Sequence, residues 1–230
     1  MKIEVLSDVD AVAKAAAQVI ASDARAAVAE RGCFLIAVSG GKTPWAMLRD
    51  LAGEELPWAR IHFFQVDERI APEGDPDRNL THLRASLANT LIPPENIHAM
   101  PVNSEDPEEG ALEYAKILHE LCGNPPVLDL AHLGLGPDGH TASLIPHDPV
   151  LTVCDRDVAL TGLYQGRKRM TLTYPMLNRS RKILWLATGA EKAPMIALLK
   201  DADPGIPAGL IEQEKALLLA DAAAVEKLRD

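Results

Sequence analysis

Residues 127–143 have the sequence VLDLAHLGLGPDGHTAS, in which an apolar run over 127–133 is followed by a glycine-rich segment that contains a histidine. The apolar run predicts a buried strand, so the glycine-rich segment begins as a loop at the carboxyl end of that strand. Ligands of open α/β sheets bind at the carboxyl ends of strands, and an imidazole exchanges protons near neutral pH. We therefore predict that His140 is the centre of the chemistry.

Strands and helices alternate on both sides of this segment. Further strands are predicted at 3–6, 33–38, 61–66, 158–161, 170–173, 182–188 and 216–219, and helices at 8–30, 45–51, 81–88, 107–121, 191–199 and 222–228. Gly32 is expected to cap the first helix and Pro44 to lie in the first turn of the second, while 145–167 has no clear pattern. The alternation predicts an α/β fold with a doubly wound, largely parallel, Rossmann-like sheet, covered by helices on both faces, in a single domain, 1–230.

The composition is that of an ordinary globular protein. Of the 230 residues 47% are hydrophobic, and no apolar run approaches the roughly 18 residues that span a bilayer. The first residues lack the apolar core of a signal peptide, so we expect a cytoplasmic protein with no membrane partner. The net charge of −10 argues against nucleic acid. Three scattered cysteines, Cys33, Cys122 and Cys154, predict neither disulfides nor a metal site.

The strand at 33–38 ends in Ser39-Gly40-Gly41-Lys42-Thr43. Glycines let backbone N–H groups approach a ligand, and the N-terminus of the following helix favours an anion, so this loop is a candidate phosphate cradle. The spacing of a Walker loop is absent, so ATP is not indicated. An ordinary strand-to-helix turn is the alternative.

Two further strands end in charged residues. In Asp67-Glu68-Arg69 a carboxylate is a candidate base and the arginine a candidate partner of an anionic oxygen, although a surface ion-pair cluster is the simpler interpretation. Lys192 follows the strand at 182–188 and lies in the predicted first turn of a helix, where a cation opposes the helix dipole unless an anion is bound.

A dinucleotide motif is present in form only. Gly134, Gly136 and Gly139 match G-x-G-x-x-G, and Asp155 stands where the ribose-binding acid would be. Pro137 lies inside the motif, however, and a polar segment follows where a Rossmann helix has an apolar face. We expect neither NAD nor any other cofactor or metal.

Taken together, these motifs resemble the 6-phosphogluconolactonase family, which is related in fold to glucosamine-6-phosphate deaminases and isomerases. The resemblance rests on segments 39–44, 67–69, 77–79, 136–144, 169–173 and 188–193, in matching order and spacing. Lys42 departs from the family, which more often has a serine there.

The resemblance implies hydrolysis of 6-phospho-D-glucono-1,5-lactone to 6-phosphogluconate. It implies that the 39–43 loop, Arg169 and Lys192 hold the phosphate, that His140 is catalytic, and that Arg69 faces the substrate. We expect neutral His140 to remove a proton from the attacking water and to return a proton to the ring oxygen. Backbone N–H groups of the loop formed by Gly136, Asp138 and Gly139 are candidate oxyanion donors. Asp67 is a candidate for orienting His140 or the substrate hydroxyls.

Two alternatives remain open. Deaminases of the superfamily continue after the histidine with Ile-Ala-Phe-Asn-Glu-Pro, which supplies a carboxylate, whereas residues 141–146 here are TASLIP and contain no acid. Deaminases also usually have a tyrosine where Arg69 stands. A non-catalytic sugar-phosphate-binding domain, as in transcription regulators, is disfavoured because no DNA-binding segment is recognisable. The chain is expected to act as a monomer or a small homo-oligomer.

Overall fold

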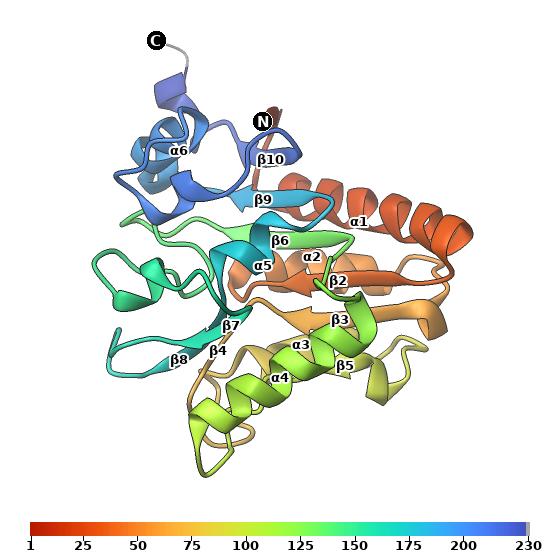
Figure 1. Ribbon diagram of the computed structural model, residues 1–230. Coiled ribbons are helices and arrows are strands. Elements are labelled where there is room, and N and C mark those ends of the chain that lie inside the picture. The colour runs from red at the N-terminus through yellow and green to blue at the C-terminus, as the bar shows by residue number, and fades with distance from the viewer. Residues whose placement is uncertain (229–230) are drawn as a thin grey trace.

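Seven parallel strands form the central sheet of the computed structural model, which describes residues 1–228 (Figure 1). In spatial order they are β1 (Lys2–Leu6), β10 (Ala216–Asp221), β9 (Ile183–Ala187), β6 (Leu130–Gly134), β2 (Phe34–Val38), β3 (Ile61–Gln65) and β5 (Ile97–His98). Every neighbouring pair runs parallel. The predicted doubly wound parallel sheet is therefore confirmed.

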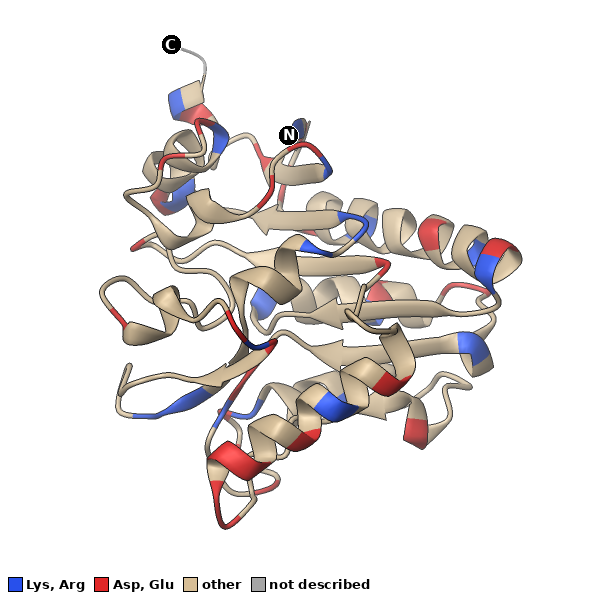
Figure 2. Cartoon of the chain, in the orientation of Figure 1, with Lys and Arg blue, Asp and Glu red and all other residues tan. Residues whose placement is uncertain are grey.

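Helices cover both faces of this sheet. One face packs against α1 (Val9–Arg31), α2 (Lys42–Ala52) and α3 (Asn79–Leu87), and the other against α4 (Pro107–Cys122), α5 (Tyr174–Asn178) and α6 (Ala193–Lys200). Side chains of a strand alternate between the two cores: in β2, Phe34 and Ile36 face the first group of helices, while Leu35 and Ala37 face the second. Figure 2 accordingly shows the central strands almost free of charge.

The long helix α1 forms as predicted. Asp8 caps its N-terminus by accepting from Ala11 N–H at 2.8 Å, and Gly32 ends it with φ of 84°, a left-handed conformation that glycine adopts without a steric cost. Its buried face is largely alanine, including Ala13, Ala17 and Ala24, and such small side chains let the helix lie close to its neighbours. No helix within residues 1–228 is long and apolar enough to cross a membrane.

The strand order reverses between β2 and β6. From β2 the sheet grows outward through β3 and β5, and from β6 it grows the other way through β9 and β10. The pairing of β2 with β6 covers only Ile36 with Leu130 and Ala37 with Ala131. In open α/β sheets, ligands bind at such a switch point, beyond the carboxyl ends of the strands.

A second sheet of three antiparallel strands stands at that edge, in the order β4 (Asp67–Arg69), β8 (Arg169–Leu172), β7 (Val158–Leu160). Strands were predicted at 158–161 and 170–173, but a separate antiparallel sheet was not. Asp67-Glu68-Arg69, predicted as the charged end of the strand at 61–66, forms a strand of its own. The chain leaves the main sheet at Val66, whose N–H still bonds to Val38 while its carbonyl accepts from Leu172 N–H at 2.8 Å.

Several predicted boundaries are corrected by the structure. The strand predicted at 127–133 begins at Leu130, α2 begins at Lys42 rather than Trp45, and β5 was missed because it has only two residues. A short 3₁₀ turn, Ala190–Lys192, precedes α6, so Lys192 lies before the α-helix rather than in its first turn. Other 3₁₀ turns are Trp58–Arg60, Pro94–Asn96, Pro149–Thr152, Pro207–Leu210 and Glu226–Leu228.

The terminal helix predicted at 222–228 is wrong. The alanine-rich sequence favours a helix, but Asp221 accepts from Ala224 N–H at 2.8 Å and from Gly189 N–H at 3.1 Å, which turns the chain directly after β10. Ala224 and Val225 are then buried in the core. Local side-chain hydrogen bonds and packing thus override helix propensity here.

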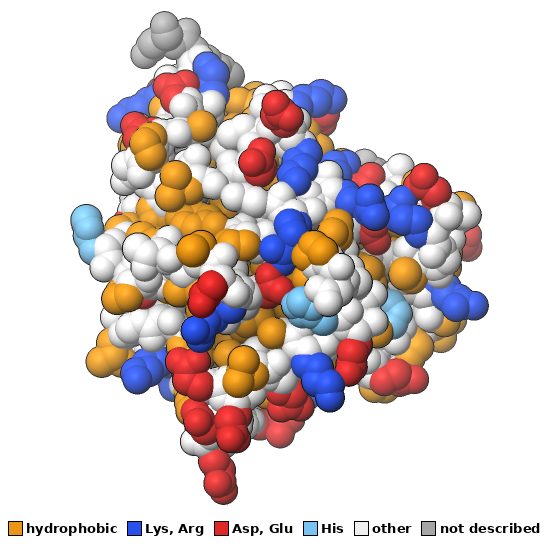
Figure 3. Space-filling view, viewed as in Figure 1, with side chains coloured by type: hydrophobic (Ala, Val, Ile, Leu, Met, Phe, Trp, Pro, Cys, Tyr) orange, Lys and Arg blue, Asp and Glu red, His pale blue; other side chains and the backbone are white. Residues whose placement is uncertain are grey.

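Acidic residues are unevenly spread over the surface. In Figures 2 and 3 they gather at the lower tip of the view, where α4 begins with Asp106, Glu108 and Glu109. Because the molecule as a whole repels anions, a site for an anionic ligand requires its own local cations.

Candidate active site

A cavity of about 190 Å³ opens where β2 and β6 diverge, between the main sheet and the three-stranded sheet. The predicted site residues that line it are Ser39, Gly40, Asp67, Arg69, Gly136, His140, Arg169 and Lys192. Gly41, Lys42, Thr43, Asp138 and Gly139 were also predicted, and they are not among its lining residues. The four strand ends singled out in the sequence therefore converge on one cavity.

His140 is presented by a tight glycine turn at the end of β6. Gly136 N–H donates to His140 O at 2.8 Å, and Gly139, with φ of 81°, donates its N–H to Gly136 O at 3.1 Å. A Cβ at Gly136 would overlap the His140 ring, and one at Gly139 would overlap Ile206. The turn thus requires both glycines.

These hydrogen bonds occupy two of the N–H groups that were expected to stabilise an oxyanion. The N–H groups of Gly136 and Gly139 are used inside the turn, and Pro137 has no N–H. Of the expected oxyanion donors in this loop, only the N–H of Asp138 is left.

The partner of His140 is Asp138, not Asp67. His140 Nδ1 lies 2.6 Å from Asp138 Oδ1, so Nδ1 carries the proton and Nε2 is the basic nitrogen. Burial raises the pKa of Asp138, but the charge of His140 and hydrogen bonds from His140 and Tyr164 outweigh it and lower that pKa below its ordinary value. The carboxylate therefore stays ionised beside the imidazole.

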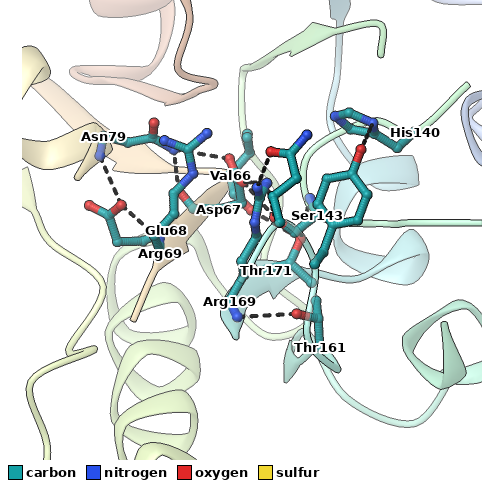
Figure 4. Close-up of polar contacts among 12 residues, drawn as sticks. Val66, Asp67, Glu68, Arg69, Asn79, His140, Ser143, Thr161, Arg169 and Thr171 are labelled. Atoms are coloured by element: carbon teal, nitrogen blue, oxygen red, sulfur yellow. Dashed lines mark hydrogen bonds and ion pairs between the residues drawn. The ribbon is translucent and has the colours of Figure 1, made fainter. Parts of the chain in front are cut away.

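Asp67 lines the cavity but is held within a buried cluster of polar contacts (Figure 4). Ser143 Oγ donates to Asp67 Oδ2 at 2.6 Å, and Asn79 Nδ2 donates to Asp67 O at 3.0 Å. Arg169 Nη1 lies 4.0 Å from Asp67 Oδ2. The carboxylate thus faces Arg169 rather than His140, and its contact with substrate hydroxyls stays a prediction.

Arg169 is buried, with 5% of its surface exposed, yet poorly paired. Its Nη1 and Nη2 reach Ser143 Oγ at 3.4 Å and Gln165 Oε1 at 3.3 Å, both long contacts, and its Nε has no hydrogen-bond partner within residues 1–228. Burial lowers the pKa of Arg169. A buried guanidinium with unused donors is suited to an anionic ligand, because charged oxygens are its strongest partners.

Glu68 was a candidate base, and the structure gives it a different task. Fully buried, it pairs with Arg78 Nε at 3.0 Å and accepts the N–H groups of Asn79 and Leu80 at 2.8 and 2.9 Å. It thereby ties β4 to the N-terminus of α3 and directs Asn79 into the cavity. Asn79 was quoted as part of a family motif but was not given a role, since nothing local to its sequence indicates this contact.

The 39–43 loop is fixed by a histidine that the sequence analysis did not single out. Ser39 N–H donates to His132 Nδ1 at 3.2 Å, and Ser39 Oγ donates to His132 O at 3.1 Å. Complete burial lowers the pKa of His132 to about 3, so the imidazole is neutral and can accept. The Ser39 hydroxyl is therefore engaged with β6, and the loop presents Gly40 to the cavity.

The other end of this loop meets the turn after β9. Thr43 Oγ1 and Thr188 Oγ1 lie 3.0 Å apart, which links the start of α2 to the segment that carries Lys192. Lys192 lines the cavity, whereas Lys42 does not. Within residues 1–228 no group of three His, Cys, Asp or Glu side chains is placed to hold a metal ion.

Tyr164 was also missed, in the segment for which no structure was predicted. It lies on the hairpin between β7 and β8, and its hydroxyl donates to Asp138 Oδ2 at 3.0 Å. Its ring lies beside Arg169, whose Cζ is 4.9 Å from the ring centroid. This side chain therefore contacts both the acidic partner of His140 and the buried arginine.

Comparison with known proteins places this arrangement among sugar-phosphate enzymes. A family model described as glucosamine-6-phosphate isomerases/6-phosphogluconolactonase matches residues 7–219. A curated protein of Synechocystis sp. named 6-phosphogluconolactonase is 43% identical over 212 residues, which cover 88% of this chain and 88% of that protein.

Solved structures agree with this relationship. The crystal structure of 6-phosphogluconolactonase from Thermotoga maritima superposes with a TM-score of 0.85 at 27% identity, covering 96% of this chain and 98% of that one. A monomeric glucosamine-6-phosphate deaminase superposes with a TM-score of 0.86 at 19% identity, covering 98% and 99% of the two chains. At that identity the second likeness concerns the fold alone.

Proposed function

Because this chain belongs to the family of glucosamine-6-phosphate isomerases and 6-phosphogluconolactonases, we propose that it hydrolyses 6-phospho-D-glucono-1,5-lactone to 6-phosphogluconate with His140 as general base. The observation that carries the proposal is the juxtaposition, in one cavity, of the Asp138–His140 pair and the under-coordinated guanidinium of Arg169. The first supplies a base and the second a partner for an anionic substrate.

In the proposed reaction, His140 Nε2 removes a proton from water as the water oxygen bonds to the lactone carbonyl carbon. The tetrahedral intermediate then breaks its bond to the ring oxygen, which receives that proton from the imidazolium. The products are a carboxylic acid, which ionises, and a free hydroxyl. Asp138 Oδ1 accepts the hydrogen bond from His140 Nδ1–H, with the two heavy atoms 2.6 Å apart, and stabilises the imidazolium without taking its proton.

The phosphate is assigned to the cationic side of the cavity. Arg169 and Lys192 line it together with Gly40, and the N-terminus of α2 follows directly. A phosphate held there orients the lactone toward His140, and positioning of this kind lowers the barrier without new chemistry. Lactones are activated esters, so a base and positioning are a sufficient set of catalytic effects.

Arg69 is our candidate for the developing oxyanion. Its Nη1 donates to Asp77 O at 2.7 Å, while its buried Nε has no partner among the described residues, and the side chain lines the cavity. A charged donor aimed into a partly closed cavity stabilises a transition-state oxyanion more than a ground-state carbonyl.

The deaminase alternative has less support in these residues. The chain after His140 has no acid over 141–146, and Asp138, two residues before it, is the only carboxylate that contacts its ring among residues 1–228. Because the fold is common to both branches, the reaction itself must be measured.

The test uses purified protein and freshly generated lactone, with spontaneous hydrolysis subtracted. We expect rapid lactone hydrolysis and no ammonia release from glucosamine 6-phosphate in a parallel assay. Ammonia release would move the assignment to the deaminase branch. Binding of 6-phosphogluconate without either reaction would support a sugar-phosphate-binding domain.

A further inference from the structure

The hairpin between β7 and β8 ends in a tight turn beside the cavity. Tyr164 and Arg167 pair across it, with Tyr164 N–H donating to Arg167 O at 2.9 Å and Arg167 N–H donating to Tyr164 O at 3.2 Å. Gln165 and Gly166 between them have φ of 52° and 80°. Two consecutive left-handed residues match the twist of a two-residue hairpin, so the tip has a defined conformation that sets the direction of Tyr164.

The tip is also anchored on its far side. Arg167 forms ion pairs with Asp75 at 3.1 Å and Asp77 at 2.9 Å, both on the loop before α3. Asp77 in turn accepts from Arg69 through its carbonyl. The hairpin is thus fixed between that loop and the His140 turn, and Tyr164 is its contact with the latter.

Tyr164 touches three parts of the site at once. Its hydroxyl donates to Asp138 Oδ2 at 3.0 Å and lies 3.5 Å from His140 Nδ1. Its ring is edge-on to the imidazole, with centroids 5.5 Å apart, and lies 4.9 Å from Arg169 Cζ. A cation near an aromatic ring is attracted by the ring's quadrupole. The tyrosine therefore contacts both the proposed base, His140, and the proposed phosphate ligand, Arg169.

Asp138 needs such a partner. Its side chain is 36% exposed and projects from a loop, and Oδ1 is the oxygen bound to His140. Without a donor to Oδ2 the carboxylate can rotate and be solvated, which would release the imidazole from a single orientation. Burial and the hydrogen bond to Asp138 raise the pKa of Tyr164, so the phenol stays a donor at neutral pH.

We infer that Tyr164 is a positioning residue: its hydroxyl fixes the Asp138–His140 pair for catalysis, and its ring holds Arg169 against the cavity. This inference rests on the proposed lactonase function. It assigns separate roles to two parts of one side chain, and those roles are separable by substitution.

Tyr164→Phe is the decisive variant. We expect kcat for lactone hydrolysis to fall by roughly 3- to 10-fold, in line with the loss of one hydrogen bond, with KM changed less than about twofold because the ring remains. Tyr164→Ala should in addition raise KM, since Arg169 loses the ring.

Tyr174→Phe is the matched control. It removes a phenol hydrogen bond of similar length, 2.9 Å to Pro207 O, outside the cavity, and should leave kcat and KM unchanged. If wild type hydrolyses the lactone and Tyr164→Phe has wild-type kcat, the role of Tyr164 is overturned. If wild type has no lactonase activity, the proposed function itself fails.

Discussion

At the scale of single residues, two buried arginines show how pairing separates a binding role from a structural one. Arg78 is 3% exposed and forms an ion pair of 3.0 Å with fully buried Glu68, whereas Arg169 is 5% exposed, has only long hydrogen bonds and lies 4.0 Å from its carboxylate partner, Asp67. A buried charge without a close partner is costly. The unfavourable burial of a poorly paired charge at Arg169 is expected where a bound ligand supplies the missing partner.

This contrast predicts opposite outcomes for two equivalent substitutions. Arg169→Met should raise KM by about 10- to 100-fold, because an interaction with a charged ligand is lost. The free energy of unfolding should change by less than about 1 kcal/mol, because Asp67 lies 4.0 Å from Arg169 and keeps its hydrogen bonds from Ser143 and Asn79. Arg78→Met should destabilise by about 3–5 kcal/mol, since it leaves the buried charge of Glu68 without its ion-pair partner.

Steady-state kinetics and urea unfolding of both variants test this prediction. A large loss of stability in Arg169→Met with unchanged KM would contradict the binding role of that side chain.

At the scale of elements, the site depends on the separation of β2 and β6 at their carboxyl ends and on the contacts that fix the turns after them. His132 on β6 takes the place of a ladder partner, since it accepts the N–H of Ser39 beyond the last paired residues of β2. The turn after β6 then depends on two glycines whose missing side chains leave room for His140 and Ile206. Each feature gives a prediction.

The buried imidazole of His132 should make stability depend on pH. Its folded pKa is lowered to about 3 from the ordinary 6.5, so below pH 6.5 the unfolded chain binds a proton that the folded chain does not. Stability therefore rises with pH across that window and is lost as pH falls. From pH 7.5 to 5.5, wild type should lose about 1.4 kcal/mol more than His132→Leu.

Urea unfolding at the two pH values measures this difference directly. His62 and His98, whose pKa values burial also lowers, are present in both proteins and cancel in the comparison. Equal losses in wild type and variant would show that His132 is not a buried neutral acceptor.

Gly136→Ala should disable the turn that presents His140. The added methyl overlaps the imidazole, so the ring must move, and a displacement of about 1 Å costs roughly 10²-fold in rate. KM should change little because the phosphate contacts lie elsewhere. Gly53→Ala is the control: its Cβ would lie 3.4 Å from Asp50 O, an ordinary contact, and it should retain wild-type kcat. Wild-type kcat in Gly136→Ala would contradict the account of the turn.

The structure also shows what local sequence can predict. Alternating apolar runs and the small or charged residues after them were enough to predict the parallel sheet and the convergence of Ser39, Asp67, His140 and Lys192. The pairing of Asp138 with His140 was within reach, because a carboxylate often accepts the N–H two residues later, as Asp138 does at 3.2 Å.

The remaining site residues depend on long-range contacts that no short pattern encodes. Asn79 enters the cavity because Glu68, eleven residues earlier, holds the N-terminus of α3. Tyr164 reaches Asp138 across 26 residues through a hairpin of the second sheet. That sheet was not predicted because strands of antiparallel and parallel sheets have similar apolar patterns when both faces are buried.

At the scale of the whole molecule, the cavity joins parts of the chain that lie on opposite sides of the switch point. The β2 side contributes the 39–43 loop and, through the second sheet, Arg69, while the β6 side contributes His140 and Lys192. The net charge of −10 is offset locally by Arg69, Arg169 and Lys192. An anion is therefore attracted to this cavity rather than to the surface at large.

The central claim is that His140 is the base of a lactone hydrolysis carried out in this cavity. Its most direct test is kcat for 6-phosphogluconolactone hydrolysis by His140→Gln, with spontaneous hydrolysis subtracted and the Kd for 6-phosphogluconate measured on the same sample. The account predicts a fall of about 10²- to 10⁴-fold in kcat, with Kd within about threefold of wild type because the phosphate contacts remain. A variant that binds the product normally and turns over at the wild-type rate would contradict it.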